Sequence, residues 1–399
     1  MNGYTEAYKL LSDNFSLEGD GGILENAGVT VRTFSFNSEF TRHLPSPPDL
    51  PGLEKDYLGM VADKDIAENR EFRYPVFLPA GYRQTNRAII LLHGLNEKSW
   101  DKYLPWAREL VLRTGHAVVC FPISFHMNRT PNNWLDYRSM AGLSHYRENK
   151  YEDQGSSTFA NAAISERLDN MPERFALSGY QSLMDLMNLV NHISSGEHPV
   201  FKEGTEIHFF GYSIGAFLAQ VMMIANPGGI LDRSRFVLFA GGTVFSHING
   251  ISRFIIDKHA FEQLRHYYLN DSSWRSRTLR SYVKAMNVKN VARAFMAMLS
   301  PDYFSSLRND VFRKHSSRIL VYALKDDKVF PEEHIMENFS GTGVWVNRLH
   351  FPYRYTHETP FPLSTKKALS QEVDRQFDDL FREMGNFLRD DNNHDFSGF

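Results

Sequence analysis

The sequence predicts an α/β fold in which a mostly parallel sheet is covered by helices on both faces. The segments RAIILLHG (residues 87–94) and HAVVCFPISF (116–125) are continuously apolar, which is typical of strands buried on both faces. The segment between them, DKYLPWARELVLRTG (101–115), has helical spacing and ends at a glycine. Strands that alternate with helices in this way indicate βαβ units, in which the strands run parallel.

The same alternation continues along the chain and defines a predicted domain of residues 71–390. The last helix carries its apolar residues on one stripe, which is enough to dock on a sheet. The further elements expected are strands at 72–81, 206–213, 235–242, 318–327 and 343–351, and helices at 178–196, 215–226 and 364–388.

Two segments interrupt this alternation. The first, about residues 126–177, is polar and irregular. The second, about residues 245–317, contains helical patterns, and a structureless loop of that length would be improbable, so we expect a helical cap. Residues 1–70 form a predicted N-terminal extension with one edge strand at 29–40, and residues 391–399 form a predicted disordered tail.

Charge and composition argue against several classes of protein. The net charge is −3 and no dense block of lysine and arginine occurs, so neither nucleic acid nor an anionic membrane is an expected partner. No apolar run reaches the roughly 18 residues of a transmembrane segment, and the N-terminus does not resemble a signal peptide, so we expect a cytoplasmic protein. The single cysteine, Cys120, rules out an intrachain disulfide and lies in an apolar strand, where a thiol is more often core than catalyst.

The turn Gly211-Tyr212-Ser213-Ile214-Gly215 is the strongest chemical signal in the sequence. It matches the pattern G-x-S-x-G, and it stands between a predicted strand and a predicted helix, where that pattern presents a nucleophile. A chain of this length would contain such a pentapeptide by chance on the order of 0.1 times. The alternative is a structural turn in which the serine has no chemical role. We favour the nucleophile, with the amide of Ile214 as one donor to an oxyanion.

A serine hydroxyl needs a base, usually histidine, and a carboxylate that orients this base. The acid and the base are expected to follow the serine in that order. Asp326 and Asp327 both end a strand, and we favour Asp327 because a turn and a proline follow it. His357 lies on a loop before the last helix and is the preferred base, whereas His350 lies within an apolar strand.

A second oxyanion donor is expected from the loop after the strand at 87–94. The amide of Leu95 fits this role, because Gly94 permits a tight turn just before it. His93 is expected to support the loop rather than to react. Asn96 and Glu97 either contact substrate or serve the turn itself.

These motifs resemble those of the α/β-hydrolase superfamily, in particular its serine esterases and lipases, over roughly residues 70–390. The resemblance includes LLHGLNE (91–97) as the oxyanion loop, GYSIGA (211–216) as the nucleophile elbow, KDDKVFP (325–331) as the acid loop and YTHETPFP (355–362) as the histidine loop. It implies an eight-stranded, mostly parallel sheet with a cap inserted after the sixth strand. Within the superfamily, the chain resembles an uncharacterised bacterial branch.

Two features depart from the pattern of the superfamily. The 70 N-terminal residues are additional, and Glu358 stands after the histidine where small residues are often found. Glu358 is therefore an alternative to Asp327 as the residue that orients His357.

Weaker signals concern substrate contacts. Asn96, Tyr212 and His126 are candidates for binding substrate, and Arg129 and Trp134 follow His126 on the same segment, where buried or cap-anchoring roles are the favoured alternative. Aromatic and methionine residues of the predicted cap line an acyl pocket or, as we favour, simply pack the cap: Phe254, Tyr268, Met286 and Met298. No motif indicates a metal or a nucleotide, so we expect no cofactor.

The sequence therefore predicts a serine hydrolase that cleaves a small-molecule carboxylic ester through Ser213, His357 and Asp327. A peptidase, an amidase or a thioesterase uses the same residues, and the sequence does not separate them. A non-catalytic protein of the same fold that binds a ligand through its cap is the rival from another class. The oligomeric state is not predicted.

Overall fold

The computed structural model describes residues 3–18, 23–24, 27–44, 62–152, 155–270 and 277–389. The predicted disordered tail at 391–399 lies outside the described residues. Among the described residues, no helix has both the length and the hydropathy that crossing a membrane requires.

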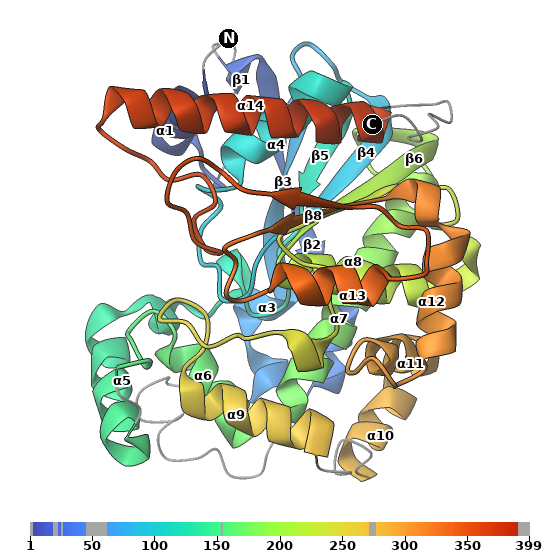
Figure 1. Cartoon of the computed structure of the whole chain (residues 1–399). Coiled ribbons are helices and arrows are strands. Elements are labelled where there is room, and N and C mark those ends of the chain that lie inside the picture. Colours follow the sequence, from blue (N-terminus) through green and yellow to red (C-terminus); the bar gives the residue numbers. More distant parts are fainter. Residues whose placement is uncertain are drawn as a thin grey trace.

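The centre of the molecule is a mixed sheet, mostly parallel as predicted, in the order β1-β2-β3-β5-β4-β6-β7-β8-β9 (Figure 1). Strands β5 to β9 run parallel in this order, and β1, β2 and β3 are antiparallel to their neighbours. The described strands are β1 (Ile23–Leu24), β2 (Val29–Asn37), β3 (Glu71–Pro79), β4 (Thr85–Leu92), β5 (Ala117–Cys120), β6 (Phe201–Tyr212), β7 (Phe236–Phe239), β8 (Ile319–Leu324) and β9 (Val346–Leu349).

Eight of these strands have four or more residues, and the two-residue β1 pairs outside β2. The segment predicted as an edge strand is therefore the second strand of the sheet. Its nine residues pair in continuous antiparallel register with β3, so the N-terminal segment extends the same sheet rather than standing apart from it.

The central strands are apolar throughout because both of their faces are buried. In β4, Ile90 and Leu92 belong to the apolar core on one side of the sheet, and Ile89 and Leu91 belong to the core on the other side. Consecutive side chains on a strand point to opposite faces of the sheet. A continuously apolar strand is therefore expected only where other elements cover both faces. Cys120 in β5 is buried in the second core, and its burial raises the pKa of the thiol.

Helices cover both faces, as predicted. Figure 1 shows α14 and α4 above the sheet, and α7, α8 and α13 below it. The first layer consists of α1 (Tyr4–Asn14), α4 (Leu104–Thr114) and α14 (Lys367–Arg389). The second consists of α7 (Glu173–Ser194), α8 (Ile214–Ala225), α11 (Lys289–Ala297), α12 (Ser305–Lys314) and α13 (Glu332–Phe339).

The two chain ends meet in the first layer. The backbone amide and the hydroxyl of Thr5 in α1 both donate to Asp374 Oδ1 in α14 at 2.8 Å. The ring of Tyr4 packs on Phe377 of the same helix, with the ring centroids 4.7 Å apart. The apolar stripe predicted for the last helix packs into this layer, and it buries residues from Val373 to Leu388.

The two segments that interrupt the alternation are rich in helices. Helices α5, α6 and α9 form a group at the bottom of Figure 1, which we call the α5–α6–α9 group. The remaining helices are α3 (Ala67–Arg70), α5 (Tyr137–Tyr151), α6 (Ala162–Asn170), α9 (Lys258–Arg265) and α10 (Arg277–Ala285). Short 3₁₀ turns lie at η2 (Glu39–His43), η3 (Asp63–Asp65), η4 (Met127–Arg129), η5 (Asn132–Leu135), η6 (Pro227–Gly229), η7 (Phe245–His247) and η10 (Ser316–Arg318), and a π-helical turn at η8 (His266–Asn270).

A fully buried arginine joins the members of the α5–α6–α9 group. Arg147 in α5 forms two hydrogen bonds with Asp257, at 2.6 and 3.1 Å, and it also binds Glu166 in α6. Asp257 is the N-cap of α9 and accepts a hydrogen bond from the amide of Ala260. The two interrupting segments, far apart in sequence, are therefore joined by one buried cation.

Candidate active site

The turn between β6 and α8 holds Ser213 in a strained conformation. Its φ of 58° and ψ of −123° are unusual for a residue with a side chain. A Cβ atom at Gly211 would lie 2.7 Å from Cα of Ala216, and one at Gly215 would lie 2.4 Å from the carbonyl oxygen of Leu92. Both glycines are therefore required for the close packing of this turn, and Ser213 follows directly on the end of a central strand.

Three loops bring Ser213, His357 and Asp327 into one row of hydrogen bonds. The distance from His357 Nε2 to Ser213 Oγ is 2.7 Å, and that from His357 Nδ1 to Asp327 Oδ2 is also 2.7 Å. Ser213 follows β6, Asp327 follows β8, and His357 lies on the loop between β9 and α14. The row therefore forms at the carboxyl ends of the parallel strands, where open α/β sheets have their sites.

The backbone fixes the carboxylate of Asp327, which is fully buried. Its second oxygen, Oδ1, accepts hydrogen bonds from the amides of Val329 and Phe330 at 2.8 and 2.9 Å. An ionised carboxylate can only accept, so His357 next to it carries its proton on Nδ1. The lone pair on Nε2 is then directed at the hydroxyl of Ser213.

Two aromatic rings hold the imidazole of His357 in its plane. Tyr212 and Phe330 lie nearly parallel to it on either side of the row, with centroid distances of 5.5 and 5.4 Å and interplanar angles of 15° and 16°. The hydroxyl of Tyr212 also donates a hydrogen bond to the backbone carbonyl of His357. Tyr212, a predicted substrate contact, lines a pocket together with Ser213, and its hydroxyl binds the histidine loop.

The alternative acid and base of the sequence lie together at the surface. Asp326 and His350 face each other at 3.5 Å, and both side chains are more than half exposed. Neither belongs to the row that contains Ser213. Glu358, the other alternative for orienting His357, instead accepts a hydrogen bond from the hydroxyl of Ser252.

The loop after β4 is held by His93 and Tyr103. His93 Nε2 accepts the amide of Ile123 at 2.9 Å, and Nδ1 lies 2.8 Å from the carbonyl of Gly94, to which it donates. Burial lowers the pKa of His93 well below its usual range, so the ring is neutral. The amide of Gly94 donates to the hydroxyl of Tyr103 at 2.9 Å.

The two residues predicted to donate to an oxyanion, Leu95 and Ile214, both lie near Ser213. Helix α8 begins at Ile214, so the amide of Ile214 has no partner within its own helix. Leu95, Ser213 and Ile214 also line one small apolar pocket, which places the loop after β4 and the start of α8 next to the serine.

Asn96 ties this loop to the two interrupting segments. Its side-chain amide donates to the carbonyl of Ala160 at 2.8 Å and to that of Phe254 at 2.6 Å. Both amide hydrogens are thereby used, although Asn96 still borders the larger pocket described next. Arg129 is fully buried and pairs with Asp185 at 2.8 Å, so its role is structural.

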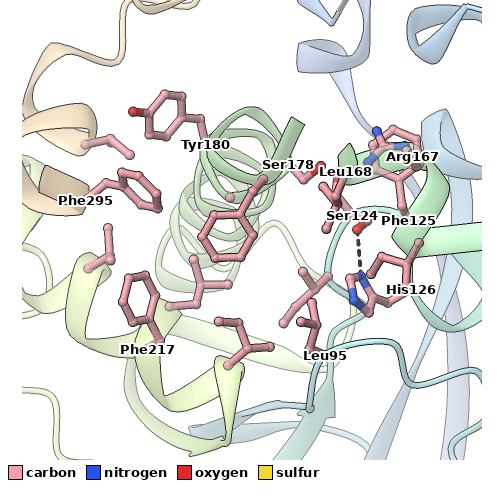
Figure 2. Close-up of a pocket in the computed structure, with 18 of the residues that line it drawn as sticks. Leu95, Ser124, Phe125, His126, Arg167, Leu168, Ser178, Tyr180, Phe217 and Phe295 are labelled. Carbon is pink, nitrogen blue, oxygen red and sulfur yellow. Dashed lines mark hydrogen bonds between the residues drawn. The ribbon is translucent and has the colours of Figure 1, made fainter. Parts of the chain in front are cut away.

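Leu95 lines two hollows, which we call the outer pocket and the inner cavity. The outer pocket, of about 490 Å³, is bordered by Ser213, His357 and the exposed ring of Phe254. The inner cavity, of about 70 Å³, is bordered by Ile214 and by His126, a predicted substrate contact (Figure 2).

The predicted acyl-lining residues of the second segment divide between these hollows and the core. Phe254 borders the outer pocket, whereas Tyr268, Met286 and Met298 are buried in the core and border neither hollow. The walls contributed by α6 and α7, such as Ile164, were not foreseen, because nothing in those helices distinguishes a cavity wall from ordinary core.

One group with metal-ligand atoms lies outside the walls of both hollows. His247, His334 and Glu337 each place one ligand atom within 4.8 Å of the others. The two rings stack with a centroid distance of 4.2 Å, and both face the exposed carboxylate of Glu337. Ordinary pairing of histidine with glutamate at the surface accounts for this arrangement.

The chain belongs to a family of unknown function (DUF6051), whose model matches residues 1–389. No curated protein matches the sequence. Solved structures similar to the chain include carboxyl esterase 2 from the mycorrhizal fungus Tuber melanosporum, with 13% identity, a TM-score of 0.44, and coverage of 97% of this chain and 99% of the other.

Two further esterases are similar at the same level. A thermostable esterase from Pseudomonas putida has 13% identity and a TM-score of 0.41, covering 97% of this chain and 90% of the other. An esterase from Pyrobaculum calidifontis has 12% identity and a TM-score of 0.39, covering 96% and 91%. The function proposed next depends on the geometry of this chain alone.

Proposed function

We propose that the protein is a serine hydrolase with the α/β-hydrolase fold that cleaves a carboxylic ester of a small molecule. One observation carries the proposal, namely the row of hydrogen bonds from Asp327 through His357 to Ser213, with the serine on a strained turn. A serine hydroxyl becomes a useful nucleophile only with such a base and such an orienting acid. A strained turn that carries this row has little use in a protein that only binds.

The first half of the proposed reaction acylates the serine. Ser213 Oγ attacks the ester carbonyl carbon while His357 Nε2 takes the hydroxyl proton, and Asp327 stabilises the resulting imidazolium. The carbonyl oxygen becomes an oxyanion, for which the amides of Leu95 and Ile214 are the proposed donors. When the tetrahedral intermediate collapses, the bond to the leaving oxygen breaks, and this oxygen takes the proton from His357 and leaves as an alcohol.

The second half releases the acid. His357 takes a proton from a water molecule, whose oxygen attacks the carbonyl carbon of the acyl-enzyme. The second tetrahedral intermediate collapses, the bond to Ser213 Oγ breaks, and Oγ recovers its proton from His357. One ester and one water give one acid and one alcohol, and no step calls for a cofactor.

The α5–α6–α9 group and residues 250–256 form the proposed cap. Its residues Tyr137, Met140 and Phe254 border the outer pocket together with Ser213. A concave pocket between the cap and the serine favours a small-molecule substrate over a folded protein. Peptidases, amidases and thioesterases would use the same row, and a substrate panel separates them.

The experiment that tests the proposal is labelling with a fluorophosphonate, followed by mass spectrometry of the adduct. We expect one adduct, on Ser213, in the unaltered protein and none in Ser213→Ala. The His357→Ala variant should label far more slowly while keeping its circular dichroism spectrum. No adduct on folded protein, or an adduct on another serine, would contradict the proposal.

The reaction class is tested with one acyl group presented as an oxygen ester, a thioester and an amide. We expect kcat/KM to be highest for the oxygen ester. A preference for the amide by the unaltered protein would replace the ester hydrolase with an amidase that uses the same residues.

A further inference from the structure

The inner cavity lies behind the two residues whose amides flank Ser213. Leu95 and Ile214 line it next to the serine, and the rest of the lining comes from residues 123–126, Trp134 and the helices α6, α7, α8 and α11. In Figure 2, Phe217, Phe295 and Tyr180 lie toward one side, and Phe125, Arg167 and His126 lie toward the other. The mainly apolar lining therefore includes a few polar residues, among them His126.

Three residues that border this cavity each have a buried polar atom without a hydrogen-bond partner among the described residues. The atoms are Nε2 of His126, Nε1 of Trp134 and Oγ of Ser178. Buried polar atoms are nearly always paired, because an unpaired one loses its bonds to water without replacement. Three such atoms around one otherwise apolar space indicate that a bound ligand supplies their partners.

The chemistry of His126 defines what the ligand must offer. Its Nδ1 lies 2.8 Å from the carbonyl of Ser124, which can only accept, so Nδ1 carries a proton. Burial, aided by the charges of Lys98, Arg167 and Arg129, lowers the pKa of His126 to about 4 against the opposing effect of the Ser124 carbonyl. The ring is therefore neutral at pH 7, and its buried Nε2 is an acceptor that requires a donor.

The lining favours a neutral donor. Among the described residues, no carboxylate borders the cavity, and its one charged lining residue, Arg167, is a cation that pairs with Asp63 at 2.9 Å, so a cationic donor would find no counter-charge there. A hydroxyl group is a small neutral donor that also accepts. It can donate to His126 Nε2, and its oxygen can accept from a second donor such as Ser178 Oγ.

We propose that the inner cavity binds the acyl chain of the substrate and that this chain carries a hydroxyl group, which donates a hydrogen bond to His126 Nε2. The acyl assignment rests on the proposed function. The acyl group stays bound to Ser213 until water releases it, so the enclosed cavity suits it. The wider outer pocket suits the alcohol, which leaves first.

Activity measurements test the substrate class. The substrates are 4-nitrophenyl hexanoate and its 3-hydroxy and 6-hydroxy derivatives. We expect kcat/KM for at least one hydroxylated ester to exceed that for the plain ester by about tenfold, the effect of one net hydrogen bond. In His126→Leu the plain ester should become the better substrate. His350→Leu changes an exposed histidine that borders neither hollow, and it should keep the original preference.

A binding measurement keeps this proposal separate from the proposed reaction. Thermal shifts of the Ser213→Ala protein are compared for hexanamide, 3-hydroxyhexanamide and 6-hydroxyhexanamide. We expect a larger shift with a hydroxylated amide, and loss of the difference when His126→Leu is added. If the hydroxylated amides bind better but no ester is cleaved, the hydroxyl site stands and the hydrolase proposal fails. Equal shifts together with equal kcat/KM values for all three esters would overturn the hydroxyl site.

Discussion

The hydroxyl of Tyr212 donates a hydrogen bond to the backbone carbonyl of His357, and the Tyr212 ring lies nearly parallel to the imidazole. Tyr212 directly precedes Ser213, so one residue joins the turn of the proposed nucleophile to the loop of the proposed base. Burial raises the pKa of Tyr212 well above its usual range, so the hydroxyl keeps its proton and remains a donor. The separation of Ser213 and His357 is thereby held by a contact that lies outside the row of hydrogen bonds from Asp327 to Ser213.

Replacing Tyr212 by phenylalanine tests this positioning role. Tyr212→Phe keeps the ring but leaves the buried carbonyl of His357 without its donor. We expect kcat on an ester to fall about tenfold with KM little changed, and the free energy of unfolding in urea to fall by about 1–3 kcal/mol. The exposed Tyr146→Phe should change neither. An unchanged kcat and an unchanged rate of fluorophosphonate labelling in Tyr212→Phe would show that His357 is held by other contacts.

The choice between the two adjacent aspartates gives a second prediction. Asp327→Asn places an amide against His357 Nδ1, which would favour the tautomer with its lone pair on the wrong nitrogen. We expect kcat to fall by about 10⁴-fold at pH 7. Asp326→Asn is the matched control, because its carboxylate is more than half exposed and faces His350 at the surface, and kcat should stay within about twofold. A larger loss in Asp326→Asn than in Asp327→Asn would reverse the assignment of the acid.

The strand pattern and the order of the motifs carried much of the sequence prediction. Continuous apolar runs indicated a sheet buried on both faces, and β4 has core on each side. The order serine, aspartate, histidine selected three residues that the structure brings within hydrogen-bonding distance. Such signals are local in sequence, since each depends on a short segment with a recognisable turn.

Other features depend on contacts between distant segments and left no local signal. Asn96 looked like a substrate contact, but its amide binds two carbonyls, one in each interrupting segment. The segment at 29–40 was expected to form the edge strand of the sheet. It is the second strand instead, because Ile23 and Leu24 pair with its outer side. The inner cavity likewise arises where four helices meet, and no single helix reveals it.

The buried cation of the α5–α6–α9 group gives a third prediction. Arg147→Met removes the positive charge and leaves the carboxylates of Asp257 and Glu166 buried without it. We expect the free energy of unfolding in urea to fall by about 3–5 kcal/mol. Arg138→Met, an exposed position on the same helix, is the control and should change it by less than about 0.5 kcal/mol. A loss of under 1 kcal/mol in Arg147→Met would mean that the carboxylates have other partners, or that they are neutral.

The fourth prediction concerns pH and follows from histidines buried in the neutral form. Burial lowers the pKa of His126 and of His198 to about 4, and that of His93 well below its usual range. In the unfolded chain each pKa is about 6.5, so between about pH 6.5 and 4 the unfolded state binds more protons than the folded state. Stability should therefore be greatest above about pH 6.5 and should fall as the pH is lowered toward 4.

The contribution of His126 can be isolated by comparing how the free energy of unfolding depends on pH with and without this histidine. A shift of about 2.5 pKa units corresponds to at most about 3 kcal/mol per buried histidine. Urea unfolding of the unaltered protein and of His126→Leu should be compared from pH 5 to pH 7, above the range in which most carboxylates titrate. The absolute stability of the variant does not matter for this comparison. Its free energy of unfolding should fall less steeply with decreasing pH, because the unfolded variant no longer binds the proton that His126 takes up on unfolding. Parallel slopes would mean that His126 takes up its proton as readily in the folded protein as in the unfolded chain, which would contradict the buried neutral ring on which the hydroxyl site depends.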